Sequence, residues 1–216
     1  MNTCQLCAAD HTAAWNVPLL ESPDFVVLPS LGALVPGWVL IVPKNHFLSM
    51  GAIPNALIPE MQDLKQTVCG HLERTYGAVS AFEHGPGGDQ RRVGCGVDHA
   101  HLHILPVDFD LSVAVAPHLP PDSCWSAATS IDCREAVQSG EDYLYLEQPI
   151  GKARIIRHRQ LGSQVFRRAV ADYLGVPEEY NWRDNPQIEN VEKTIQAFKA
   201  DALGASAGLN LSECAA

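Results

Sequence analysis

Three histidines stand at alternate positions in the stretch GVDHAHLHILP, residues 96–106. They are His99, His101 and His103, a third of the 9 histidines in a chain of 216 residues. Successive side chains of a β-strand point to opposite faces, so a strand here would place all three imidazoles on one side. The residues between them are apolar, which is typical of a half-buried strand that carries a polar site. The stretch therefore predicts a strand with a functional face.

Two kinds of chemistry fit such a face, besides the less specific interpretation of a solvated strand. Alternate histidines can ligate one metal ion, as in the His-x-His element of zinc hydrolases. Alternatively, a neutral imidazole can attack phosphorus while a neighbouring imidazole donates to the phosphate oxygens. The glycine-rich segment 85–96 favours the second, because glycine lets backbone N–H groups approach phosphate oxygens closely.

A C-x-x-C pair, Cys4 and Cys7, lies near the N-terminus. It is interpreted as a redox pair, half of a zinc site, or a chance spacing. A thioredoxin-type redox pair should follow a buried strand, and no strand pattern precedes this one. A zinc site would need two further ligands from elsewhere in the chain. The total of seven cysteines is odd, which disfavours a disulfide scaffold.

The composition limits the partners that the chain can bind. Hydrophobic residues are 46% and charged residues 19%, as in an ordinary globular protein. The net charge of −10 disfavours binding to long nucleic acid, but it does not exclude a small anionic ligand held by local donors. No apolar run approaches the roughly 20 residues needed to cross a bilayer, and no signal peptide is visible. We therefore expect no membrane partner and a cytoplasmic location.

The first half of the chain predicts an antiparallel sheet with one packed helix. Residues 24–29 and 37–46 are rich in β-branched and aromatic residues and are expected to pair as strands. Apolar residues at spacings of three and four predict a helix over 54–76, and residues 78–84 predict a third strand. With the histidine strand, this order is typical of an α+β fold.

The second half is expected to be an extension of this core. Residues 107–140 show little periodicity and are interpreted as a connecting region. A β-hairpin around Gly151-Lys152 and two helices, over 163–174 and after Asn185, are predicted to follow. We therefore expect a core over residues 1–110, an extension over 111–204, and a disordered tail over 205–216.

Two blocks of sequence resemble the histidine triad (HIT) superfamily of nucleotide hydrolases and transferases. HAHLHIL fits its pattern His-φ-His-φ-His-φ-φ, in which φ is apolar. PGWVLIVPKNH, residues 36–46, is similar to the segment pGH-x-L-V-i-P-k-x-H that precedes the triad. The resemblance extends from about residue 4 to residue 106. It implies a HIT-like antiparallel sheet with a helix packed on it.

The resemblance implies a mechanism for the central histidine. His101 would attack the α-phosphorus of a small nucleotide, such as a dinucleoside polyphosphate or a phosphoramidate. Water would then resolve the nucleotidyl-histidine intermediate, while His103 donates to the phosphoryl oxygens. The third histidine favours hydrolysis, because the galactose-1-phosphate uridylyltransferase branch has glutamine near that end of the motif. Nucleotidyl transfer or phosphorolysis, a non-catalytic nucleotide- or RNA-binding module, and a catalytic zinc site on the triad are the alternatives.

The resemblance also implies a structural zinc ion. Many HIT proteins share zinc between an N-terminal C-x-x-C and two histidines, which correspond here to Cys4, Cys7, His46 and His99. Two thiolates and two imidazoles suit tetrahedral Zn²⁺, and a closed shell of four protein ligands makes the site structural.

Several positions depart from the common HIT pattern. The usual acidic residue that binds the ribose hydroxyls is replaced by serine, the usual A-G-Q-x-V before the triad lacks its glutamine, and FEHG stands where asparagine is usual. The candidate substrate-binding residues at these positions are Ser30, Glu83, His84, Cys95, Gly96 and Val97. Serine can form a hydrogen bond, but it cannot capture a diol with two oxygens, so the nucleoside and leaving-group preferences stay open.

Residues 164–184 resemble the C-terminal region of CwfJ-like proteins, a HIT-related family associated with RNA lariat processing. Seven of the 15 basic residues lie between Lys152 and Arg183. This local excess is interpreted either as a solvated surface or as a site for a polyphosphate or an oligonucleotide end. The sequence leaves open whether the chain forms a homodimer through its helix, as many HIT proteins do.

Overall fold

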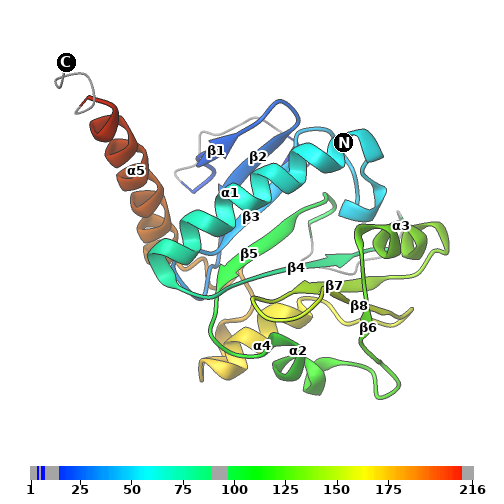
Figure 1. The fold of residues 1–216 in the computed structure, drawn as a ribbon. Helices are drawn as coiled ribbons and strands as arrows, with labels where there is room; N and C mark the ends of the chain where they lie inside the picture. Colours follow the sequence, from blue (N-terminus) through cyan, green and yellow to red (C-terminus); the bar gives the residue numbers. More distant parts are fainter. Residues whose placement is uncertain (1–3, 5, 8–14, 89–96, 211–216) are drawn as a thin grey trace.

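A computed structural model describes residues 4, 6–7, 15–88 and 97–210. Its strands form one sheet in the order β1-β2-β3-β5-β4-β7-β8-β6, and every neighbouring pair is antiparallel (Figure 1). The strands are β1 (Leu20–Glu21), β2 (Phe25–Pro29), β3 (Val39–Pro43), β4 (Val79–Gly85), β5 (Leu102–Pro106), β6 (Ser126–Ala127), β7 (Tyr143–Glu147) and β8 (Arg154–Arg157). The predicted pairing of the first two long strands is confirmed by β2 and β3.

Five α-helices pack on this sheet, so the predicted α+β fold is confirmed. They are α1 (Ile58–Tyr76), α2 (Leu111–Ala114), α3 (Ser130–Gln138), α4 (Val165–Tyr173) and α5 (Ile188–Asn210). Short 3-10 turns occupy Met50–Ala52, Asn55–Leu57, Ala116–His118 and Pro177–Glu179. Among the described residues, no helix is both long enough and apolar enough to cross a membrane.

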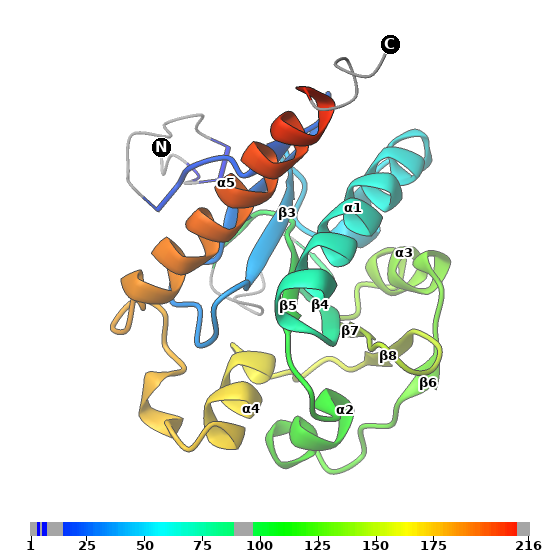
Figure 2. The same cartoon turned by 60° about the vertical axis from the view of Figure 1, so that its left-hand side comes forward.

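One face of the sheet is covered by α1. The apolar residues of this helix recur every three or four positions and are buried against alternate residues of the central strands. The buried apolar residues of α1 are Met61, Leu64, Val68 and Leu72. From α5, Phe198 joins the same cluster, and Figure 2 shows α5 beside α1.

The opposite face is covered by α2 and α4, both from the second half of the chain. Phe166 of α4 stacks on Phe82 of β4 with ring centroids 4.2 Å apart. Trp38, before β3, and Leu105 of β5 belong to the same buried cluster. Because strand side chains alternate, this is the face that carries His103, so α4 packs on the side of the candidate catalytic histidines.

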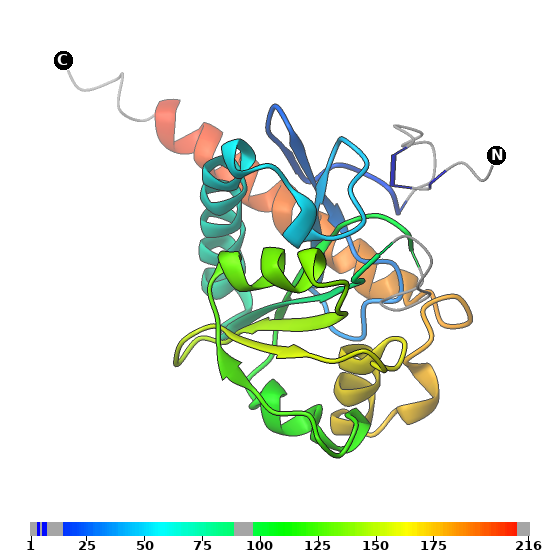
Figure 3. The same ribbon diagram turned by 90° about the vertical axis from the view of Figure 1, so that its right-hand side faces the viewer.

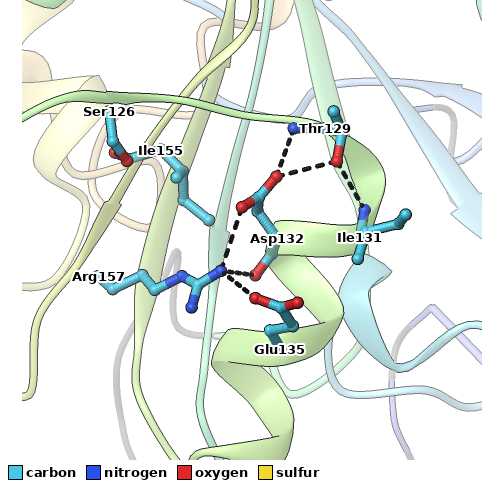
Figure 4. A network of polar contacts seen from close by, with 7 residues as sticks. All are labelled: Ser126, Thr129, Ile131, Asp132, Glu135, Ile155 and Arg157. Atoms are coloured by element: carbon cyan, nitrogen blue, oxygen red, sulfur yellow. Dashed lines mark hydrogen bonds and ion pairs between the residues drawn. The ribbon is translucent and has the colours of Figure 1, made fainter.

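The interpretation of residues 107–140 as a connecting region is wrong, since they contain α2, α3 and β6. At the start of α3, the Thr129 side chain accepts from the Ile131 N–H while the Thr129 N–H donates to Asp132 Oδ2 at 2.7 Å (Figure 4). Arg157 of β8 donates to the side chains of Asp132 and Glu135. The reciprocal cap formed by Thr129 and Asp132 satisfies backbone donors that a short helix otherwise leaves unpaired. Thr and Asp three positions apart were the signal for it.

The predicted hairpin is confirmed by β7 and β8, and β7 pairs with β4. Strands of the extension therefore continue the sheet of the core, with α3 lying over β7 and β8 (Figure 3).

The tail expected from residue 205 requires a correction, because α5 continues to Asn210. Once the packed first half of a helix is formed, each further residue adds one hydrogen bond, and the alanines at 202, 205 and 207 have high helix propensity. Residues 211–216 lie outside the described part of the chain.

Candidate active site and metal site

The three histidines do not share one strand face as predicted. β5 begins at Leu102, so only His103 lies within a strand, and residues 98–99 form a bend. The Ala100 N–H donates to the Phe47 carbonyl at 2.6 Å. The His99 Nε2 atom lies 2.8 Å from the Pro43 carbonyl oxygen. These bonds take the place of ladder bonds and turn His99 away from the other two imidazoles.

The four predicted metal ligands come together at this bend. The Sγ atoms of Cys4 and Cys7 and the Nδ1 atoms of His46 and His99 lie within 4.8 Å of one another. His99 Nδ1 is 3.4 Å from Cys4 Sγ and 3.3 Å from Cys7 Sγ, and His46 Nδ1 is 3.0 Å from Cys7 Sγ. Zinc bonds of about 2.3 Å to sulfur and about 2.0 Å to nitrogen place tetrahedral ligands about 3.5 Å apart. The cluster therefore has the donor set and the spacing of a tetrahedral S₂N₂ site.

The tautomer of His99 also fits a metal ligand. A carbonyl oxygen only accepts, so the bond to Pro43 places the ring proton on Nε2 and leaves the lone pair on Nδ1. Burial lowers the pKa of His99, which keeps the imidazole neutral. The lone pair therefore lies on the nitrogen that belongs to the sulfur cluster.

A hydrogen bond to the backbone decides which ring nitrogen of His101 carries the proton. Its Nδ1 lies 2.7 Å from the His99 carbonyl oxygen, which only accepts, so Nδ1 carries the hydrogen and Nε2 the lone pair. Burial, reinforced by the charge of Arg167, lowers the pKa of His101 to about 4. At neutral pH the ring is therefore a neutral imidazole with its lone pair on Nε2.

His103 has the opposite tautomer. The indole N–H of Trp38 donates to His103 Nδ1 at 3.0 Å, and an indole has no acceptor, so the ring proton lies on Nε2. Phe82 stacks on the same imidazole with centroids 4.5 Å apart and an interplanar angle of 21°. Burial holds the pKa of His103 well below its ordinary value. His101 and His103, with ring centroids 4.8 Å apart, thus present a lone pair and a donor side by side.

These two histidines line one cleft, together with residues of the N-terminal half and of the extension. Ser30 and Val97, two of the predicted substrate-binding residues, lie in its wall. Apolar side chains from the β2–β3 region form much of the remainder, with Leu28, Pro29, Leu31 and Leu40 among them.

The other predicted substrate-binding residues are placed differently. Glu83 lies on the far face of the sheet, where the Met50 N–H donates to its Oε1 at 2.6 Å and the Tyr143 O–H donates to its Oε2 at 2.5 Å. His84 lies on the catalytic face, buried beside His101, and burial lowers its pKa to about 3. Neighbouring residues of one strand cannot face the same side, which the sequence interpretation overlooked. Cys95 and Gly96 lie outside the described residues.

Sequence reasoning missed Trp38, Arg167 and Trp182. Arg167 and Trp182 come from the extension, and both line the cleft. Trp38 stands where the segment pGH-x-L-V-i-P has histidine, and this mismatch was a usable signal. The local sequence around Arg167 shows no comparable signal, because its position depends on how α4 packs.

The family model of the HIT domain matches residues 16–110. This segment is a HIT domain. It contains His46, His99, His101 and His103, and it ends directly before α2. The resemblance of residues 164–184 to CwfJ-like proteins lies beyond the HIT domain and stays a prediction. No curated protein sequence matches the chain.

Several solved structures are similar to parts of the chain. A histidine triad nucleotide-binding protein from Sulfolobus tokodaii is 17% identical, over 63% of this chain and 87% of its own, with a TM-score of 0.40. A Zn-bound histidine triad family protein from Mycobacterium smegmatis is 18% identical, over 64% and 92%, with a TM-score of 0.40. Yeast Ap4A phosphorylase in complex with AMP is 12% identical, over 76% and 72%, with a TM-score of 0.38.

Proposed function

We propose that the protein is a nucleotide hydrolase that cleaves at the α-phosphate through a nucleotidyl-histidine intermediate. One observation carries the proposal: His101 and His103 line one cleft with opposite tautomers, each set by a neighbour that can form only one kind of hydrogen bond. Nucleophilic attack on phosphorus needs a lone pair, and stabilisation of the developing phosphoryl charge needs a donor.

The reaction has two displacement steps. In the first, the lone pair of His101 Nε2 forms a bond to the α-phosphorus, and the leaving group departs with the electron pair of its own bond. The ring then carries phosphorus on Nε2 and hydrogen on Nδ1, and the His99 carbonyl stabilises its positive charge. In the second, a lone pair of water forms a bond to phosphorus, the water loses a proton to solvent, and the P–N bond breaks so that its electron pair returns to Nε2. In both steps His103 Nε2–H donates to a phosphoryl oxygen.

Cys4, Cys7, His46 and His99 would hold Zn²⁺ in a closed shell. When bound, zinc would supply structural cross-linking between the N-terminal segment and the chain before β5. The backbone of His99 connects the two sites, since its carbonyl orients His101. The extension, proposed as residues 111–204, contributes part of the wall of the same cleft.

Incubation with diadenosine tetraphosphate and adenosine 5′-phosphoramidate in ¹⁸O-labelled water, with and without inorganic phosphate, tests the proposal. We expect labelled AMP that does not depend on phosphate. Formation of ADP in the presence of phosphate would make the protein a phosphorylase, and no turnover would favour a nucleotide-binding module.

Two variants separate the roles of the residues. We expect His101→Ala to abolish turnover and to retain zinc, whereas the matched control His158→Ala removes a histidine that pairs with Asp122 and should leave turnover unchanged. Loss of zinc from His101→Ala would contradict the separation of the catalytic and metal sites.

A further inference from the structure

Arg167 of α4 is a buried cation in the wall of the histidine cleft. Arg167 is only 2% exposed, and its guanidinium carbon lies 4.8 Å from the centroid of the Trp38 ring. It donates to the Gly32 carbonyl, and its Nε donates to the Tyr180 carbonyl at 3.1 Å. Both of these acceptors are carbonyl oxygens, and the two bonds fix the orientation of the guanidinium. The cation is thus held in place beside the candidate nucleophile.

The charges around the cleft favour an anion. Among the described residues that line it, Arg167 is the one with a formal charge at neutral pH, and none is acidic. Ser30 stands where the HIT pattern has an acidic residue, so that carboxylate is absent as well. This cationic cleft lies in a chain of net charge −10. The electrostatic potential of the cleft therefore favours a ligand with several negative charges.

The loop that contains Ser30 is pressed against the extension. A Cβ added at Gly32 would lie 2.5 Å from Trp182 Cβ and 2.7 Å from Arg167 Nη2. Gly32 has a φ of 71°, which lies in the left-handed region that favours glycine. Both the close approach and the backbone conformation therefore require glycine at this position. The loop and the guanidinium therefore hold a defined relative position.

The chemistry of the Arg167 side chain indicates which leaving group the cleft can stabilise. An amine leaving group must receive a proton, whereas a phosphate leaving group departs as an anion whose new charge must be stabilised. Arginine stays protonated and cannot act as the acid, but it binds phosphate oxygens through a planar fork of donors. A cation held in the wall of the histidine cleft therefore suits cleavage of a P–O–P bond.

We propose that Arg167 binds the phosphate chain of a nucleoside 5′-polyphosphate, so that the enzyme prefers phosphate over an amine as the leaving group. This inference rests on the hydrolase function proposed above. During the first displacement, the electron pair of the P–O bond stays on the leaving phosphate, and Arg167 stabilises the negative charge that develops there.

Comparison of two substrates across three variants tests the inference. Arg167→Gln should lower kcat/KM for diadenosine tetraphosphate about 10- to 100-fold more than it lowers kcat/KM for adenosine 5′-phosphoramidate, the effect of losing a charge-assisted hydrogen bond to the phosphate chain. Arg167→Lys should restore part of the loss, because it keeps the charge but not the fork. Arg168→Gln is the matched control, since Arg168 packs on the Tyr180 ring at 3.8 Å and does not line the cleft.

An equal loss on both substrates, or on neither, would overturn the role of Arg167. It would leave the hydrolase proposal standing as long as His101→Ala is inactive. Turnover that does not depend on His101 would instead refute the hydrolase proposal itself.

An experiment on the wild-type protein covers the case in which Arg167→Gln does not fold. Tripolyphosphate should inhibit diadenosine tetraphosphate turnover competitively, with an inhibition constant at least about 10-fold lower than that of inorganic phosphate, since more charge-assisted bonds form. Equal inhibition constants for the two anions would overturn the proposal.

Discussion

Replacement of Trp38 by phenylalanine tests the assignment of His103 as a hydrogen-bond donor. The substitution keeps an aromatic ring in the core but removes the N–H group that bonds to His103 Nδ1 at 3.0 Å. Without that donor, nothing in this contact keeps the ring proton on Nε2. A part of the molecules should then carry it on Nδ1, which leaves a lone pair, and not a donor, facing the phosphoryl oxygen.

The size of the effect follows from burial. Trp38 is 0% exposed and His103 is 2% exposed, so water does not replace the lost bond. A buried acceptor without a partner costs about 1–3 kcal/mol. We therefore expect the free energy of unfolding of Trp38→Phe to fall by about that amount, and kcat to fall about 10- to 100-fold, because about 1.4 kcal/mol in the barrier is tenfold in rate.

The assay combines single-turnover kinetics with ¹⁵N NMR of labelled histidine, whose two ring-nitrogen shifts report which nitrogen carries the proton. Phe82→Leu is the packing control, since it removes the ring stacked on His103 but keeps the Trp38 bond, so its ¹⁵N signature should not change. Trp38→His supplies a ring N–H at the position where the HIT pattern has histidine, and it should be more active than Trp38→Phe. An unchanged His103 tautomer in Trp38→Phe would refute the reasoning.

Three other predictions test the surroundings of the site. Burial raises the pKa of Glu83 from 4.5 to about 7, so the folded protein keeps this proton to higher pH than the unfolded chain does. As the pH rises from about 4.5 to about 7, the free energy of unfolding of the wild type should therefore fall by about 3 kcal/mol relative to that of Glu83→Gln. The same pH dependence of this free energy in both proteins, measured by urea denaturation, would contradict the prediction. Cys4→Ala should lose zinc and unfold at a lower temperature, whereas Cys69→Ala, which lies outside the cluster, should keep its metal. Atomic emission measures the metal content of both variants. Thr129→Ala should lower the free energy of unfolding by about 1 kcal/mol, measured by denaturation, because α3 loses its capping side chain, and an unchanged midpoint would show that the cap does not contribute.

Elements with a strong local pattern were predictable from the sequence. The pair β2 and β3, the helix α1 and the hairpin of β7 and β8 each have a period that one buried face imposes. The start of β5 was not predictable in this way, because His99 and Ala100 follow the alternating pattern while their hydrogen bonds go to Pro43 and Phe47. Long-range hydrogen bonds of this kind leave no periodic signal.

The candidate site shows the same division. The types and spacing of His99, His101 and His103 predicted either metal binding or phosphoryl chemistry, and the resemblance to HIT proteins implied that His99 joins Cys4 and Cys7 at a metal site. Only the tertiary structure decided that Glu83 faces away from the cleft, that Trp38 and the His99 carbonyl set opposite tautomers, and that Arg167 faces the histidines. The reason is physical: residue type determines which atoms can react, but proton position, pKa and local field depend on burial and on partners brought together from distant parts of the chain.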